Sequence, residues 1–512
     1  MTSQSVQKGG RHMQRTIRLL NTPRFVELHD VPSYTAMERY ITYDRALTRA
    51  DHVVLRNLAN SIRTFEKNEL DMATGIANAK WGGNPIARCQ ADGIGASPNG
   101  MYNTTGTDKS LGNDASDLTK IRSFSDPTHQ DFESNVFLSI DTNSACFPPT
   151  VREYVLQPYL RWARQIVRRE TDVSMLTHLI LYSITSVPSA LVLYWRFTYL
   201  HGVLHISMQL YYIGTYTLMM HQHIHLRGIL ARKYSRLDHL FPYFTDPLMG
   251  HTWNSYFYHH VKHHHVEGNG PDDLSSTIRY DRDNVIHFLH YVSRFFFLIW
   301  LDLPLYFLRK GQLVKAVRAA GSEFLSYAFY YMVALVDANA TLFVFILPLF
   351  MPPQPLTLKV SAYVYQSNRF CFNDGYHTSH HLNPMRHWRD HPISFLEQKH
   401  IYTNEGALVF HNIDFLMITF RLLCKDYRHL AECLVPLGQQ IGLTMEQRVQ
   451  LLRRQTRKFT EVDIQEKFQT NAACGHANPR PLLTENVDGL FYPVAGDYGN
   501  LPPVVVFDCH PS

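Results

Sequence analysis

The stretch "GVLHISMQLYYIGTYTLMMHQHIH", Gly202 to His225, decides the fold that we expect for this chain. Its first 19 residues, ending at Met220, carry no formal charge. A helix of that length crosses about 30 Å of hydrocarbon at about 1.5 Å per residue. His221 and His225 follow directly and stand four residues apart, which places them on one face of a helix. The stretch therefore predicts a membrane helix that ends in two histidines able to bind a metal ion.

Three other apolar segments have comparable length. Met175 to Trp195 holds 21 residues without a formal charge, and the six-residue connector 196–201 joins it to the opening stretch. This short connection predicts a tight helical hairpin, with two buried core helices of a soluble protein as the alternative. Phe288 to Leu308 and Phe324 to Met351 are also apolar. The last segment is longer than a straight crossing needs, so we expect it to tilt or to break near Asp337.

Basic residues flank the open ends of the first hairpin, whereas its connector holds only Arg196. The flanking residues are Arg161, Arg164, Arg168, Arg169, Arg227, Arg232, Lys233 and Arg236. By the positive-inside rule, both open ends should face the cytosol. The rule conflicts with a second hairpin, because the basic stretch 309–323 would then face the lumen. One solution is that Phe288 to Leu308 dips into the membrane without crossing it.

Composition narrows the class of protein further. The 512 residues are 45% apolar, and the apolar residues are concentrated in the middle third of the chain. A formal charge of +5 is small and scattered, which argues against nucleic-acid binding. Seven cysteines without a C-x-x-C pair argue against a disulfide framework or a zinc ribbon. We divide the chain into a polar N-terminal region (1–150) with a disordered linker at 91–117, an apolar domain (151–430), and a C-terminal helix and tail (431–512).

These patterns predict an all-α integral membrane protein. Helical hairpins would cross the bilayer, and a cytosolic helical cap would carry the histidines. Near the C-terminus, Thr444 and Gln447 have the spacing of a capping box, which predicts the start of a basic helix. We expect that helix to be solvated, with contact to a membrane surface as the alternative. The last 45 residues are rich in Pro, Gly and Asn, which is typical of a tail.

Three histidine clusters lie just outside the apolar segments, in the order H-x-x-x-H, H-x-x-H-H and H-x-x-H-H. Their members are His221, His225, His260, His263, His264, His377, His380 and His381. Imidazole is a neutral nitrogen ligand for iron, zinc, copper or nickel, and each spacing faces one side of a helix. A single cluster is weak evidence, since histidine-rich runs also arise as compositional bias. Three clusters at the same membrane boundary indicate one shared metal site.

Another histidine pair shows why position matters. His201 and His205 repeat the spacing of the first cluster. However, His205 precedes His221 by 16 residues, which is about 24 Å along one helix. We therefore expect this pair at the opposite membrane face, as interfacial or helix-packing residues and not as metal ligands.

With these clusters, the chain resembles the membrane fatty-acid desaturase/hydroxylase family over roughly residues 154–430. The segments "HTWNSYFYHHVKHHHVEGNGPDDLSSTIRY" and "RFCFNDGYHTSHHLNPMRHWRDHP" look like a fungal-type branch of that family. The resemblance implies that the eight clustered histidines bind two iron ions. It leaves His259 and His265 as neighbours of the second cluster. His223 faces away from the first cluster and would support it or the helix packing.

The resemblance also implies a reaction. Two ferrous ions reduce O2, and hydrogen is abstracted from an unactivated C–H bond of a fatty acyl lipid. A second abstraction gives a double bond, which is the outcome we favour, whereas oxygen rebound gives an alcohol. Redox-inert zinc could not support either reaction. Electrons would come from an external donor, in this family usually cytochrome b5 and its NADH reductase, and the protein would lie in the endoplasmic reticulum membrane with the histidines and both termini in the cytosol.

The chain departs from the family pattern at one point. The family usually has a further ligand between the last membrane segment and the third cluster, but no histidine occurs here between His290 and His377. The joint after Met351 looks short. The resemblance therefore allows a catalytically impaired or non-enzymatic relative as an alternative. A metal transporter fits less well, because transport sites near the bilayer midplane need ionisable residues inside the crossings.

Overall fold

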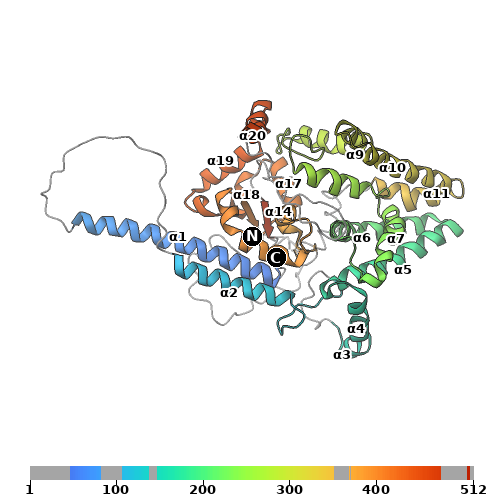
Figure 1. Ribbon diagram of the computed structural model, residues 1–512, viewed down its shortest axis with the longest axis horizontal. Helices are drawn as coiled ribbons and strands as arrows, with labels where there is room; N and C mark the ends of the chain where they lie inside the picture. Colours follow the sequence, from blue (N-terminus) through green and yellow to red (C-terminus); the bar gives the residue numbers. More distant parts are fainter. Residues whose placement is uncertain are drawn as a thin grey trace, which may run out of the picture.

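Helices form almost all of the regular structure. The computed structural model describes residues 47–81, 107–137, 147–350, 368, 371–473 and 504–507. Of the described residues, 74% are helical and almost none are in strands, which confirms the all-α prediction. Figure 1 shows two groups of helices, with α5, α6, α7, α9, α10 and α11 on one side and α1, α2, α14, α17, α18 and α19 on the other.

The first predicted hairpin is formed by α5 (Val173–Trp195) and α6 (Tyr199–Leu226). The turn between them is shorter than predicted, because α6 begins at Tyr199 with the Thr198 side chain accepting a hydrogen bond from the backbone N–H of His201. Aromatic contacts join the two helices, with ring centroids 4.8 Å apart between Tyr182 and Tyr212. Helix α6 also continues past its apolar part without a break, so it carries the first histidine cluster into the interior.

The second apolar pair forms α9 (Val285–Arg309) and α10 (Leu313–Ala334), which pack against each other. The basic stretch 309–323 is not an extended loop: it forms a short turn and then the first half of α10. The predicted break is confirmed at Asp337, whose side chain accepts a hydrogen bond from the N–H of Ala340 at the start of the next helix. That part of the chain comprises α11 (Ala338–Thr341), the π-helix η7 (Leu342–Ile346) and α12 (Leu347–Leu349).

Among the described residues, two helices are long and apolar enough to cross a membrane: residues 170–195 and α9. The helix α6 and the α10–α12 segment do not meet the same criterion. The core helix of a soluble protein can have the same length and composition as a membrane helix.

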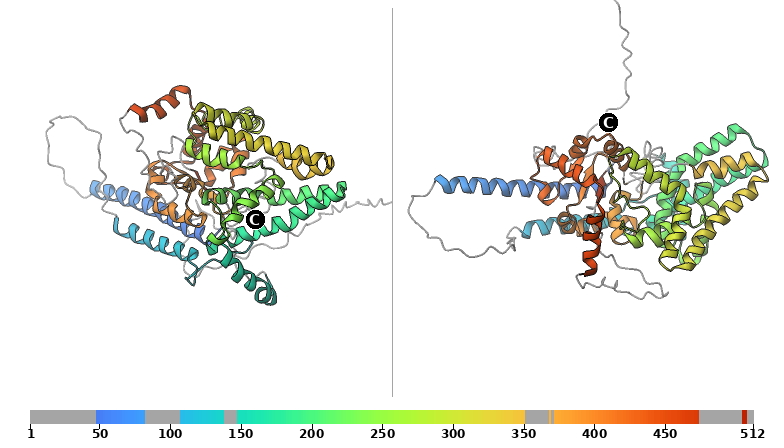
Figure 2. Two further views of the ribbon diagram at one scale, coloured as in Figure 1. Left: turned by 45° about the vertical axis from the view of Figure 1, so that its right-hand side comes forward. Right: turned by 90° about the horizontal axis from the view of Figure 1, so that it is seen from above.

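The polar N-terminal region packs on the third histidine cluster. Helices α1 (Arg49–Trp81) and α2 (Thr107–Ser125) share a hydrophobic core with α15 (His391–Glu397) and the segment before it. The linker prediction was wrong for its last part, because residues from Thr107 onward form α2; residues 82–106 lie outside the described part. Ile121 and Phe124 of α2 are buried, and this tertiary burial overrides the polar local composition. Figure 2 shows α1 extending away from the apolar helices.

The C-terminal part adds helices and one small sheet. The capping box is confirmed, since Thr444 and Gln447 exchange side-chain and backbone hydrogen bonds at the start of a helix. In the sheet, β1 pairs antiparallel with β2 and parallel with β3, so part of the predicted tail is a strand. The elements are α16 (Lys399–Asn404), β1 (Leu408–His411), α17 (Phe415–Leu423), α18 (Tyr427–Cys433), β2 (Leu434–Val435), α19 (Met445–Thr456), α20 (Glu461–Ala473) and β3 (Val504–Phe507).

Further elements, most of them short, include those that carry the second and third histidine clusters. They are α3 (Pro149–Val151), η3 (Arg152–Leu156), α4 (Gln157–Ile166), α7 (Ser235–Leu248), η6 (Phe257–His264), α8 (His265–Glu267), η8 (Asp374–Tyr376) and α14 (His377–Leu382). Of these, η3 and η6 are π-helices, in which backbone hydrogen bonds join residues five apart.

Candidate metal centre

Four elements bring five histidine rings together. His221 and His225 come from the end of α6, His260 and His265 from η6 and the start of α8, and His380 from α14. One ring nitrogen of each lies within 4.8 Å of the others. Four of the five residues are buried and His265 is half-buried. Segments more than 100 residues apart in sequence therefore converge on one small volume that is rich in nitrogen.

The closest contacts run through the Nε2 atoms. His221 Nε2 lies 2.7 Å from His380 Nε2, which lies 3.1 Å from His265 Nε2. His265 Nε2 in turn lies 3.0 Å from His260 Nε2. Each nitrogen of a neutral ring offers either one proton or one lone pair, so protons can serve at most two of these three contacts with full hydrogen bonds. A bound cation would accept all four lone pairs.

An unpartnered nitrogen atom and the neutral state of the rings also indicate a metal site. The Nε2 of His225 is buried and has no hydrogen-bond partner. Burial, together with the neighbouring imidazoles, holds the pKa of His225 and of His260 well below the usual value for histidine. The rings are therefore neutral at pH 7, which is the form that binds a metal. Two nitrogens bound at right angles at about 2.1 Å lie about 3.0 Å apart, close to the observed spacings. The residues fit a transition-metal ion.

The π-helical winding of η6 decides which histidines of the second cluster join this group. The backbone N–H of His265 donates to the carbonyl of His260, five residues earlier, so the two side chains come round to one side. His263 is turned away: its Nε2 accepts from the Leu274 N–H at 3.1 Å, and its ring packs edge-on against Tyr306. The structure thus places His265 in the group and leaves His263 outside it.

The other predicted ligands lie beside the five-ring group. His377 Nε2 and His381 Nε2 are 3.0 Å apart, and Asp374 lies 3.0 Å from the Nδ1 of His377. His221, Asp374 and His377 form a second set of donor atoms within 4.8 Å of one another. The ring of His264 lies 4.9 Å from that of His381 between centroids. His221, Asp374 and His377 could therefore also hold a metal ion.

Of the eight predicted ligands, His221, His225, His260 and His380 belong to the five-ring group. His264, His377 and His381 adjoin it, and His263 does not face it. The sequence interpretation set His265 aside as a neighbour because it assumed α-helical spacing. The stretch that lacks the family's further ligand, residues 351–367, lies outside the described part of the chain.

Carboxylates orient several of these rings, and the sequence analysis did not identify them. Asp273 lies 2.7 Å from the Nδ1 of His264, and Asp374 contacts His377 as described above. Such a carboxylate fixes the tautomer and direction of a ligating imidazole. His223, predicted to face away, lies 3.2 Å from Asp238, which also accepts the N–H of Ile229. This contact ties the end of α6 to α7 and agrees with the helix-packing role considered for His223.

A buried carboxylate from the N-terminal region supports the third cluster. Asp51 of α1 is fully buried and accepts hydrogen bonds from Tyr376 Oη at 2.7 Å and from Asn368 Nδ2 at 2.9 Å. Tyr376 directly precedes His377. Because Asp51 and Tyr376 are 325 residues apart, no local sequence pattern could have indicated this contact.

The distant histidine pair lies at the other end of α6, as predicted. His201 Nε2 and His205 Nδ1 are each 2.9 Å from the hydroxyl of Ser189 on α5. His205 is buried and also contacts Gln209. The expectation that this pair serves helix packing is confirmed.

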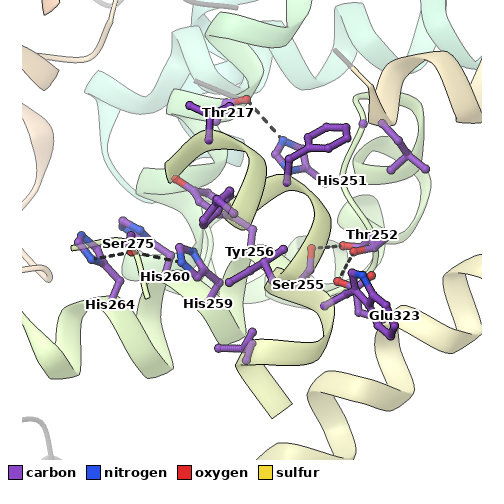
Figure 3. Close-up of a pocket in the computed structure, with 18 of the residues that line it drawn as sticks. Thr217, His251, Thr252, Ser255, Tyr256, His259, His260, His264, Ser275 and Glu323 are labelled. Atoms are coloured by element: carbon purple, nitrogen blue, oxygen red, sulfur yellow. Dashed lines mark hydrogen bonds between the residues drawn. The ribbon is translucent and has the colours of Figure 1, made fainter. Parts of the chain in front are cut away.

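A cavity of about 800 Å³ adjoins the histidines. His221, His260, His264, His377 and His381 line one part of it. The rest of the wall is largely apolar, and α9 contributes to it Phe288, Phe295, Ile299, Trp300 and Leu303 among others. Figure 3 shows His259, His260 and His264 on one side of this cavity, with Tyr256 beside them. The volume falls within the range of about 300–1,000 Å³ that is usual for small-molecule sites.

Comparisons of the chain with protein-family models, with curated proteins and with solved structures find no match. The candidate site therefore rests on its geometry and on the histidine pattern.

Proposed function

We propose that this protein is an O2-dependent di-iron oxidase that introduces a double bond into a fatty acyl lipid at the cytosolic face of a membrane. One observation carries the proposal: the five-imidazole group opens onto an apolar cavity large enough for a lipid chain. Neither feature alone would indicate an oxidase. A buried metal site without a substrate cavity fits a structural role, and an apolar cavity without metal ligands fits lipid binding alone.

The residues of the chain would divide the work as follows. The five-ring group would hold one iron ion, and His377, His381, His264 and Asp374 would hold the second. When bound, the iron pair supplies the O2 reduction and the one-electron chemistry that zinc lacks. The aromatic wall from α9 would hold the acyl chain against His221, His377 and His381 and exclude water from it. Each methylene group buried there contributes about 0.8 kcal/mol to binding.

Exposed apolar side chains support a membrane location. Leu191 of α5 is 65% exposed, Leu200 of α6 is 73% exposed and Phe297 of α9 is 61% exposed. Apolar side chains exposed along several helices of one group are costly in water and are expected where lipid covers them. We propose the orientation given by the flanking arginines, with the histidines cytosolic, within the endoplasmic reticulum membrane. Electrons would then come from cytochrome b5 and its reductase on that side.

The proposal predicts iron content and a lipid product together. Full-length protein expressed with iron should carry about two iron ions per chain, measured by elemental analysis, and the host lipids should gain an unsaturated acyl species by mass spectrometry. Because a ligand that binds only the folded state stabilises it by about 2.7 kcal/mol at 100 times its dissociation constant, chelation should lower the unfolding temperature and Fe²⁺ should restore it.

Matched variants locate the site. His260→Ala should abolish the product and lower the iron content, because it removes a buried member of the group. His400→Ala is the control, since His400 is an exposed histidine on α16. If the new lipid is hydroxylated and not unsaturated, the protein is a hydroxylase that uses the same site. Stoichiometric zinc without iron, or iron without any new lipid, would rule out the oxidase and favour the impaired relative.

A further inference from the structure

The cavity has a second polar part that the metal chemistry does not use. Glu323 and Tyr327 of α10, together with Thr252 and Ser255 of the segment before η6, line it. The Thr252 hydroxyl donates to Glu323 Oε1 at 2.7 Å, and the Ser255 hydroxyl donates to the backbone carbonyl of Thr252 at 2.9 Å. Figure 3 shows Thr252, Ser255 and Glu323 grouped on the side away from His259, His260 and His264, with Tyr256 between the two groups.

Glu323 has capacity for a further hydrogen-bond donor. Within the described part of the chain, its partners are hydroxyl groups, those of Thr252 and Tyr327, and not a cation. A carboxylate offers about four lone-pair sites, so two hydroxyl donors leave room for more. A carboxylate that is removed from water is costly unless its remaining acceptor sites are used. The side chain therefore favours a ligand that brings a donor of its own.

We propose that Glu323 and the hydroxyls around it bind the polar head of the lipid substrate, and that this head carries a hydroxyl group or an amide N–H. This inference rests on the proposed function for the lipid chain, and it adds the chemical class of the head. An ester head lacks a donor, and a free carboxylate would meet like charge at Glu323. With the head held at one part of the cavity and the imidazoles at another, the head would also set which carbon of the chain reaches the metal.

A purely structural role for Glu323 is the competing explanation. Its bond to Thr252 ties α10 to the segment before η6, and the neighbouring hydroxyl of Ser326 accepts the N–H of Trp253 at 2.9 Å. That role predicts no selectivity among lipid heads. Binding selectivity is thus the property that separates the two explanations.

The test measures binding of three lipids that share one brominated 18-carbon chain. Their heads are an N-acyl ethanolamine, with an amide N–H and a hydroxyl; a methyl ester, with no donor; and the free acid. Full-length protein in phosphatidylcholine nanodiscs is used as purified and without reductant, so no turnover occurs. Bromine quenches the fluorescence of Trp300, which lines the cavity, and the Trp300→Phe variant identifies the quenching that arises there.

We expect the ethanolamine lipid to bind about tenfold more tightly than the methyl ester, as one hydrogen bond to a charged group provides. Glu323→Gln should reduce this ratio to about two, and Glu323→Asp, which keeps the charge, should give an intermediate ratio. Glu405→Gln is the matched control, because Glu405 is exposed and does not line the cavity. It should bind like the unchanged protein.

Three results would overturn the inference. They are equal binding of the ethanolamine lipid and the ester by the unchanged protein, tighter binding of the free acid, and an unchanged ratio in Glu323→Gln. The first two need no variant, so a variant that fails to fold leaves the test intact. Selective binding without any oxidised product would count against the proposed function alone. Oxidised product without selectivity would count against this inference alone.

Discussion

Replacing His265 with alanine should weaken metal binding while leaving the stability of the fold nearly unchanged. His263→Ala should instead lower the stability while leaving metal binding nearly unchanged. The two residues lie two positions apart in the same histidine run. A regular α-helix with the H-x-x-H-H pattern would make His263 the ligand. The π-helix η6 instead directs His265 toward His260, His380 and His225 and turns His263 toward Tyr306.

The size of each effect follows from the contacts. His265→Ala deletes one of five imidazole donors, and the loss should weaken metal binding by about 10–100-fold or more, since removing even a supporting partner of a ligand costs that much. The His263 side chain is completely buried and accepts the N–H of Leu274. Its removal should cost about 2–3 kcal/mol for the cavity and about 1 kcal/mol for the hydrogen bond.

The assay pairs two measurements on each full-length variant in detergent. Iron per chain is measured by elemental analysis after equilibration at a buffered Fe²⁺ concentration, and stability is measured by chemical denaturation of the metal-free protein. We expect low iron and near-normal stability for His265→Ala, and near-normal iron and low stability for His263→Ala. If His263→Ala loses iron and His265→Ala keeps it, the winding argument for η6 is wrong.

Two further predictions concern stability. Asp51→Asn should destabilise the protein by about 2–4 kcal/mol and loosen the third histidine cluster, because it weakens the buried acceptor of Tyr376 and Asn368. Chemical denaturation measures this loss, and unchanged stability would show that the contact contributes little. Burial lowers the pKa of His251 to about 4. Between about pH 6.5 and pH 4 the unfolded chain therefore binds a proton at this residue that the folded chain does not. As the pH is lowered through this range, the free energy of unfolding should decrease by up to about 1.4 kcal/mol per pH unit. His251→Gln should flatten the slope by that amount, and an unchanged slope would show that His251 titrates normally in the folded protein.

Local patterns were reliable where the deciding interactions are themselves local. The capping box at Thr444 and the helix break at Asp337 each depend on residues three positions away. The pairing of His221 with His225 depends only on the pitch of an α-helix, and their ring centroids lie 5.3 Å apart. The linker prediction failed in part for the opposite reason: α2 is held by burial of Ile121 and Phe124 against other segments.

The sequence by itself determined the helical class, the apolar hairpin and the existence of a histidine group at its end, because charge-free length and helical spacing are readable from neighbouring residues. Only the tertiary structure decided which histidines belong to that group and which residues hold them in place. A π-helix is rare because its winding is less favourable than that of an α-helix, and here η6 is held between the other histidines and α9. The contact between Asp51 and Tyr376 likewise exists only after α1 has docked. Such interactions join separate segments of the chain, 325 residues apart for Asp51 and Tyr376, so no local pattern encodes them.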